Sequence, residues 1–442
     1  MENWINGSMK SMNYQNSNNP LLHHCTGAVA LIALFLSNII PLKAQDFELH
    51  GFVQTNFSLR IANTGEARTS DGDRLPDYVL GDERVQLEVT RFGEAAQLLG
   101  KIDIYYDAVD QRANFDVREA YVDLNLGKFD IRAGRQIITW GVGDLVFIND
   151  VFPKNWVAFL SGQPLQYLKF GSDAVNINFF PESVSMQLIA IPFYQADILP
   201  RGERLLAFDP LPTMDNRKEV EPDMSIENTQ LAARLYRYLG NFDVSLYFYR
   251  GFWGSPPGMV VDLDADLLTF THPRLNVYGL SLQGAFLNGV LSLEGGYYDS
   301  RDDSDGTNPG IENSQIRFLA GYQRALGENL TLGLQYYGER IQEFARYRQN
   351  LPPAFPQRKE MRHTLSLRVT QLLKYQTVRL SFFAFYSPNE KDYYLNPEIK
   401  YDFGNGVWLA AGSILLGGEK DHTFFGQFEK NDNVYFVLRY AF

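Results

Sequence analysis

The sequence predicts an all-β fold, a transmembrane antiparallel β-barrel of about eighteen strands, with about sixteen as the alternative count. Three observations carry this prediction. Apolar and polar residues alternate along many short segments, and tight turns alternate with longer polar connections. The chain also ends on an alternating strand, residues 434–442, whose last residue is aromatic.

The closing segment places a large apolar side chain at every second position from Val434 to Phe442. Successive side chains of a strand point to opposite faces, so one face would meet lipid and the other a wet interior. The ending resembles the C-terminal signal that bacterial outer-membrane barrels present to their assembly machinery, and this resemblance implies that Phe442 engages that machinery. An amphipathic edge strand of another β fold is the alternative.

Residues 1–44 are predicted to be a signal peptide. The apolar run 28–36 is too short to span a bilayer, and Ala44 is a small residue ahead of a cleavage point before Gln45. The polar leader is long, so a start at Met9 or Met12 is an alternative. The single cysteine, Cys25, would leave with the leader, which suits an oxidising compartment and excludes disulfides and thiolate metal sites. Residues 45–442 would then form one barrel domain.

Composition also favours a barrel. The chain has 32 Phe and 25 Tyr, yet no apolar stretch beyond the leader is long enough for a transmembrane helix. The formal net charge of −12 comes from acids gathered between strands, such as those at 262–266 and 299–305, which we expect in external loops. This acidic balance, without a basic cluster, argues against nucleic-acid binding.

The order of connections predicts the strand count. Tight turns are expected near residues 92–94, 127–128, 181–182, 240–241, 288–289, 327–329, 374–376 and 404–406. Longer connections are expected near residues 62–77, 107–112, 141–171, 193–227, 252–272, 300–313, 340–361, 387–391 and 417–431. With both termini periplasmic, these eight turns and nine loops demand eighteen strands, and an even count lets the first strand pair antiparallel with the last and leave no open edge. We expect no plug domain ahead of the first strand.

Ionisable side chains share one face of the predicted strands, and we expect that face to line a pore. The predicted pore-lining residues are Arg84, Glu88, Lys101, Asp103, Glu119, Asp123, Arg132, Arg135, Arg234, Arg317, Arg368 and Arg379. Strict alternation would place Arg135 on the lipid face, at a cost of about 2–4 kcal/mol. We therefore predict a β-bulge at Gly134 that turns Arg135 inward. A position at the membrane interface and a different register are the alternatives.

The connection 141–171 is too apolar for a solvated loop, because side chains such as Phe147 and Phe159 need burial. We predict that this third loop folds into the barrel and that Asp144, Asp150, Lys154 and Trp156 define the narrowest point. An apolar cap over the barrel mouth and a short external helix are the alternatives.

One hairpin carries a resemblance to known proteins. The run EAYVDLNLGKFDIRAGRQ, residues 119–136, followed by TWG at 139–141, resembles a hairpin of alginate-export-like proteins and related porin families of Gram-negative outer membranes. The resemblance implies a monomeric or trimeric passive channel for small solutes or an anionic polysaccharide. It also implies that Arg132, Arg135 and Trp140 are pore or mouth residues. The mixed charges of the predicted pore depart from the strongly basic interior of an alginate exporter.

Metal, cofactor and catalytic sites find little support. The loop 301–312 approximates a calcium loop, but Arg301 at its first position and the flanking strands favour a solvated acidic loop. No catalytic motif is present, and His50 on an inward face is the first candidate if the barrel houses a hydrolase. We expect no cofactor and no metal.

The predicted function is an outer-membrane channel, not an enzyme, for passive diffusion of small hydrophilic solutes, with a preference for anions as a finer hypothesis. A polysaccharide export pore, a barrel-housed hydrolase and a surface binding protein are the alternatives. The expected partners are outer-membrane lipid, lipopolysaccharide, the assembly machinery and a small solute. The sequence leaves the oligomeric state open.

Overall fold

The computed structural model describes residues 47–62, 76–93, 95–200, 202, 204–255, 258–353 and 355–442. The predicted signal peptide, residues 1–44, lies outside these described residues. Among the described residues, we find no helix with the length and apolar character that a membrane crossing requires.

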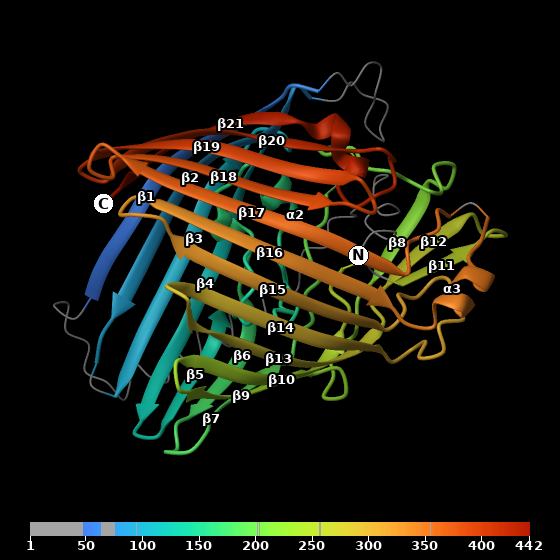
Figure 1. The fold of residues 1–442 in the computed structure, drawn as a ribbon, viewed down its shortest axis with the longest axis horizontal. Helices are drawn as coiled ribbons and strands as arrows, with labels where there is room; N and C mark the ends of the chain where they lie inside the picture. The colour runs from blue at the N-terminus through green and yellow to red at the C-terminus, as the bar shows by residue number, and fades with distance from the viewer. Residues whose placement is uncertain are drawn as a thin grey trace.

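Eighteen strands form one antiparallel sheet. They are β1 (Phe47–Arg60), β2 (Tyr78–Arg91), β3 (Ala96–Asp107), β4 (Arg112–Leu126), β5 (Phe129–Gln136), β6 (Ser172–Phe179), β7 (Ser185–Ile191), β9 (Gln230–Leu239), β10 (Phe242–Phe252), β13 (Arg274–Phe286), β14 (Gly289–Ser300), β15 (Gln315–Ala325), β16 (Leu330–Ile341), β17 (Met361–Leu373), β18 (Val378–Ser387), β19 (Asp392–Gly404), β20 (Val407–Gly418) and β21 (Asn433–Ala441). Strand β1 pairs with β2 and also with β21, so the sheet closes on itself (Figure 1). The prediction of eighteen strands is confirmed, and sixteen is wrong.

The end of the chain takes part in this closure. The backbone N–H of Phe442 donates to the carbonyl of Gly51 at 2.9 Å, and the N–H of Gly51 donates back at 3.0 Å. A Cβ on residue 51 would lie 2.8 Å from the Phe442 ring, so glycine is needed where the terminal ring lies on β1.

The two faces of the wall differ as the alternation predicts. On β1, Val53 and Phe57 are 49% and 40% exposed on the outside, whereas Asn56 and Ser58 are fully buried on the inside. On β21, Phe436, Leu438 and Tyr440 repeat the outward apolar row. An apolar exterior around a polar interior is the arrangement that a barrel in a bilayer requires.

The connections separate the barrel into two ends. The short turns lie at one end, which we call the short-turn rim, and the longer connections lie at the other, the long-loop rim. The hairpin between β13 and β14 turns at Leu287 and Asn288, with φ of 47° and 61°. Gly289 already pairs with Phe286, so the turn lies one residue earlier than the predicted Asn288–Gly289.

Three further strands lie outside the barrel at the long-loop rim (Figure 1). Strands β8 (Asn216–Val220), β11 (Gly258–Asp262) and β12 (Leu267–Thr271) form a separate sheet around Phe270 and Leu268. The sequence predicted only loops in these two segments. Short helical elements α2 (Trp156–Leu160), η2 (Leu165–Tyr167), α3 (Phe344–Asn350) and η3 (Gly426–Asn431) complete the described connections.

The predicted bulge at Gly134 is wrong. Gly134 pairs in continuous register with Tyr121 on one side and Ala174 on the other. Gly134 has a φ of 125°, which L side chains rarely adopt, and a Cβ there would lie 2.3 Å from the carbonyl oxygen of Ala120, so both the backbone conformation and the close approach require glycine. A register shift does occur on the other side of β4, where Lys101 of β3 pairs with Glu119 and Ile102 with Val117, which leaves Arg118 as the extra residue.

Candidate pore constriction

The third loop, residues 141–171, lies inside the barrel and is bound to the wall formed by β13 and β14. The carboxylate of Glu294 accepts hydrogen bonds from the backbone N–H groups of Val142 at 2.8 Å, Gly143 at 3.1 Å and Asn149 at 2.8 Å. A Cβ on Gly279 would lie 1.5 Å from Oδ1 of Asn149, so the loop packs into a depression of the wall. A buried carboxylate needs such donors, and here the loop backbone supplies them.

A second anchor joins the loop to β16 and β17. The guanidinium of Arg368 donates to both carboxylate oxygens of Asp144, through Nη2 at 2.7 Å and through Nε at shorter range. The side chain of Gln335 accepts from the backbone N–H of Asp144 at 2.8 Å and donates to its carbonyl at 2.9 Å. Bidentate Arg–carboxylate pairs fix geometry as well as charge, so residue 144 is held at one place on the wall.

The opposite side of the loop is bound to β1, β4 and β21. Arg118, the extra residue of the β4 bulge, donates to the carbonyl of Gln166 at 2.8 Å and lies 4.5 Å from the ring centre of Tyr167. Asn433 of β21 donates to the carbonyl of Leu160 at 3.1 Å, and Asn56 of β1 donates to that of Gly162 at 3.5 Å. The third loop therefore crosses the barrel interior from wall to wall.

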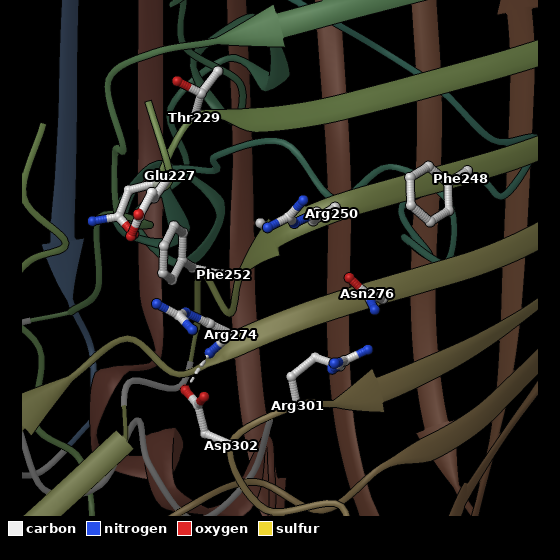
Figure 2. Close-up of a pocket in the computed structure, with 11 residues that line it drawn as sticks. Glu227, Thr229, Phe248, Arg250, Phe252, Arg274, Asn276, Arg301 and Asp302 are labelled. Atoms are coloured by element: carbon white, nitrogen blue, oxygen red, sulfur yellow. Dashed lines mark hydrogen bonds between the residues drawn. The ribbon is translucent and has the colours of Figure 1, made fainter. Parts of the chain in front are cut away.

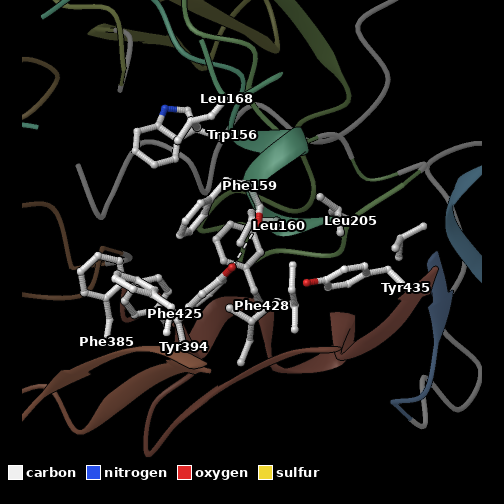
Figure 3. Close-up of a cluster of buried hydrophobic side chains, with 14 of the residues drawn as sticks. Trp156, Phe159, Leu160, Leu168, Leu205, Phe385, Tyr394, Phe425, Phe428 and Tyr435 are labelled. Carbon is white, nitrogen blue, oxygen red and sulfur yellow. Dashed lines mark hydrogen bonds between the residues drawn. The ribbon is translucent and has the colours of Figure 1, made fainter. Parts of the chain in front are cut away.

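Aromatic side chains fill the space between the loop and the wall of β18 to β21 (Figure 3). Phe159 of α2 stacks on Tyr394 of β19, with ring centres 4.6 Å apart. Phe385 of β18 stacks on Phe425, which belongs to the last long connection, at 5.7 Å. Trp156 contacts Phe159 edge to face. This packing predicts a rigid loop, because stacked aromatic pairs add to the free energy of burial.

Two cavities lie one above the other along this wall. The upper cavity, of about 70 Å³, faces the long-loop rim, and its lining includes Phe147, Trp156, Phe159, Phe385, Phe424 and Phe425, which we call the aromatic constriction. Glu339 and Arg362 are the charged residues that line it. The lower cavity, of about 450 Å³, faces the short-turn rim, and Phe159 lines both cavities. The small aromatic cavity thus lies toward the long-loop rim and the larger one toward the short-turn rim, with Phe159 between them.

The lower cavity is positively charged. Its lining includes the cations Arg368, Arg379, Lys400 and Arg439 and the single carboxylate Glu398. Arg379 pairs with Glu398 at 2.8 Å, and Arg368 pairs with Asp144. Lys400 lies over the ring of Trp408 at 3.8 Å, and Arg439 lies over Phe52 at the same distance. Among the described residues, neither Lys400 nor Arg439 has a carboxylate within ion-pairing distance.

The predicted pore residues form paired rows on the interior face. Lys101 lies between Glu88 at 2.9 Å and Glu119 at 3.3 Å, and Arg132 pairs with Asp123 at 2.7 Å. Arg84 pairs with Asp82 at 2.6 Å and at shorter range with Asp103. Arg234 bonds Ser245, and Arg317 lies 3.4 Å from Glu339. Opposite charges thus face each other at close range along the wall.

Arg135 departs from this set. Alternation from Arg132 and Gln136, which share the interior face, puts Arg135 on the other face, where it pairs with Asp173 at 2.7 Å. The structure therefore places it away from the predicted pore lining. Asp173 supplies the partner that an outward arginine needs, so no bulge is required.

The four predicted constriction residues divide into two groups. Trp156 lines the aromatic constriction, and Asp144 holds Arg368 at the lower cavity. Asp150 and Lys154 are each 4% exposed and pair with each other at 3.3 Å, inside the loop. Lys154 also donates to the carbonyls of Asp150 at 2.7 Å and Phe152 at 2.8 Å, so this pair supports the loop from within.

Several residues of the site were not predicted as such. Glu294 alternates inward on β14, but no sequence signal marks it as the anchor of a loop 145 residues away in the chain. Lys400 alternates inward on a predicted strand, whereas Phe424 and Phe425 lie in a connection expected to be solvated. Phe425 is buried and Phe424 is partly buried because the third loop packs against them, and the sequence does not show that contact.

The calcium-like loop is occupied by contacts within the protein. Asp303 accepts from the backbone N–H of Thr307 at 3.2 Å and of Asn308 at 2.8 Å, and Glu312 pairs with Arg358. Among the described residues, no group of three or more His, Cys, Asp or Glu side chains is placed to hold a metal ion.

The fold is similar to that of solved outer-membrane proteins. OccK11 (OpdR) of Pseudomonas aeruginosa is 11% identical, with a TM-score of 0.51 over 90% of this chain and 96% of that one. OccK10 (OpdN) of the same organism is 11% identical, with a TM-score of 0.50 over 90% of this chain and 99% of that one. No protein-family model and no curated protein sequence matches the chain, so the resemblance to alginate-export-like proteins stays an expectation. At this identity the likeness shows the barrel fold alone.

Proposed function

We propose that this chain is an outer-membrane channel for passive diffusion of small hydrophilic solutes, with a preference for anions. The observation that carries the proposal is the pair of cavities on the wall of β16 to β21, where the aromatic constriction shares Phe159 with a larger cavity lined by four cations and one carboxylate. The apolar outer face supports a position in the membrane, and the long-loop rim then faces the exterior.

Transport in this proposal needs no binding step. Lys400 and Arg439, which have no carboxylate partner among the described residues, attract anions into the lower cavity. Paired rows such as Glu88–Lys101–Glu119 orient a solute without holding it, because their charges are already compensated. Flux then follows the concentration gradient.

The preference for anions is tested by the reversal potential in planar bilayers under a KCl gradient. Lys400→Glu reverses a charge in the lower cavity, and we expect the reversal potential to move toward the cation value. Lys218→Glu makes the same charge change on β8, outside the barrel, and we expect the wild-type value. An equal shift in both variants, or none in Lys400→Glu, would contradict the role of the lower cavity.

Polysaccharide export fits the geometry less well. The third loop is bound to opposite walls through Glu294 and Arg118, so it crosses the barrel interior. A hydrated polymer strand needs a wider continuous path. The proposal therefore favours small solutes.

We also propose that the chain is not an enzyme. His272 bonds Tyr194 at 2.6 Å and Glu219 at 2.8 Å, which resembles a catalytic relay in its order of groups. The cavity beside Tyr194 measures about 10 Å³, too small for a substrate. Burial raises the pKa of the Tyr194 hydroxyl well above its ordinary value, so this group stays protonated. The three side chains join β8 to the loop ends as a structural contact.

The histidine first considered for catalysis is solvent-exposed. His50 of β1 lies 3.6 Å from Glu48 near the short-turn rim, and both side chains are more than half exposed. The ion-pair partner of His50 is thus one exposed carboxylate, which gives no support to a nucleophilic site.

A further inference from the structure

The outer surface of the barrel carries a groove of about 440 Å³ at the long-loop rim, over the ends of β10, β13 and β14 (Figure 2). Three exposed arginines line it: Arg250 from β10, Arg274 from β13 and Arg301, which follows β14. The groove lies on the opposite face of the wall from the two cavities described above, because Tyr247 and Tyr249 of β10 point inward.

Two of the three guanidinium groups in the groove have no partner among the described residues. Among the described residues, the guanidinium groups of Arg250 and Arg274 have no ion pair or hydrogen bond. Arg301 lies 3.8 Å from Asp299, at the limit of an ion pair. Glu227 and Asp302 also line the groove, and Asp302 accepts the backbone N–H of Arg274 at 2.7 Å. Three cations thus face two carboxylates, one of which is already engaged.

The position of the groove relative to the apolar surface is given by strand register. Arg250 pairs with Asn276, two residues closer to the rim than the pair Phe248–Tyr278. Tyr278 also pairs with Tyr297 of β14. Two residues further from the rim, the next pair on the outer face is Leu246–Leu280. Alternate residues on a strand are about 7 Å apart. Reading away from the rim, the surface therefore passes from arginine to aromatic to leucine.

That order matches the layers of a bilayer leaflet. Aromatic side chains gather at the boundary between headgroups and hydrocarbon, and leucine lies deeper. The arginines then lie at the level of lipid headgroups. Phe248 and Tyr278, 36% and 47% exposed with ring centres 5.5 Å apart, are open to an acyl chain directly below.

We infer that this groove binds a phosphorylated glycolipid of the outer leaflet, with its phosphate between Arg250 and Arg274 and an acyl chain along Phe248 and Tyr278. Guanidinium groups suit phosphate because they donate parallel, charge-assisted hydrogen bonds. The adjoining apolar surface is what distinguishes a lipid from free phosphate. The inference rests on the membrane location proposed above and not on channel activity.

The test measures binding of bisphosphorylated lipid A to the folded, detergent-purified protein by native mass spectrometry. We expect Arg250→Gln with Arg274→Gln to weaken binding about tenfold or more. The matched control is Arg112→Gln with Arg340→Gln, on exposed arginines of the same rim that already pair with Asp110 and Glu360. The control should bind as the wild type does.

Two further measurements distinguish binding of the whole lipid from binding of its phosphate alone. Phe248→Ala with Tyr278→Ala should weaken lipid A binding, and inorganic phosphate at the same concentration should not displace the lipid. Equal lipid binding by the wild type and the Arg250→Gln, Arg274→Gln variant would overturn the inference, as would equal competition by inorganic phosphate. The single variants give the same comparison if the double variant does not fold. Unitary conductance should stay at the wild-type value throughout, so the outcome is independent of the channel proposal.

Discussion

Glu294 and Asn149 are joined by two hydrogen bonds, since one carboxylate oxygen of Glu294 accepts both the backbone N–H of Asn149 at 2.8 Å and its side-chain N–H at 2.9 Å. This contact fixes a loop from one hairpin against a strand on a distant part of the wall. It is one of the contacts that hold the third loop inside the barrel.

Removing this anchor should loosen the third loop. Glu294→Ala leaves the N–H groups of Val142, Gly143 and Asn149 without their acceptor, and each unsatisfied buried donor costs about 1–3 kcal/mol. We expect noisier and larger open-channel currents in planar bilayers. Glu182→Ala, in an exposed short turn, should leave the current trace unchanged. Identical noise in both variants would show that the anchor does not hold the loop.

The ion pair between Asp144 and Arg368 should control both size and charge of the passage. Asp144→Asn leaves the guanidinium of Arg368 without its full counter-charge at the lower cavity, so anion selectivity should rise. The reversal potential under a salt gradient measures this change. The exchange Asp144→Arg with Arg368→Asp restores the pair and should return selectivity toward the wild-type value; failure of both effects would place the pair outside the path of ions.

Phe159 lines both cavities, so its truncation should join them. We expect Phe159→Ala to raise unitary conductance, at a cost in stability of about 3–5 kcal/mol because a buried ring is lost. Phe248→Ala removes an aromatic ring from the outer face and serves as the control. An unchanged conductance in Phe159→Ala would move the narrowest point elsewhere.

Acid should weaken the contact between two long connections. Burial alone would raise the pKa of Glu312, but the Arg358 guanidinium outweighs burial and holds the pKa below its ordinary value of 4.5. Because the folded pKa is the lower one, the stabilisation is present above pH 4.5 and is lost as pH falls through the folded pKa. Glu312→Gln should lower stability at pH 7 by roughly 1.5–3 kcal/mol.

The measurement is the difference in unfolding free energy between the wild type and Glu312→Gln from pH 7 down to pH 3. We expect the difference to shrink below pH 4.5. A difference that stays constant with pH would mean that the carboxylate charge does not contribute.

The barrel was predictable because alternation, turn chemistry and strand count point to the same structure. On β1, Val53, Phe57 and Leu59 are exposed whereas Gln54, Asn56 and Ser58 are buried, as the alternation indicates. The outer sheet was not predictable, since β8 has the polar sequence NRKEV and pairs with β12 about fifty residues later. Short polar strands carry no periodic signal.

Interior contacts were predictable only in part. The apolar composition of residues 141–171 required burial and so indicated an inward loop, but not the residues that receive it. Arg135 shows a limit of the alternation pattern. Its partner on the outer face, Asp173, lies on the neighbouring strand β6, and the pattern within one strand does not show which residue a neighbouring strand places opposite it. Pairing between distant strands decides such cases.

The central claim is that solutes cross the barrel through the lower cavity, and cysteine chemistry tests it most directly. The only cysteine of the sequence is Cys25, ahead of the predicted cleavage point, so an introduced thiol is unique in a chain that is cleaved there. Ser381 lines the lower cavity, and its neighbour Leu380 is exposed on the outer face. In single-channel recordings, a negatively charged thiol reagent should reduce the current of Ser381→Cys and leave that of Leu380→Cys unchanged. A wild-type protein without conductance steps, or equal responses of the two variants, would contradict the claim.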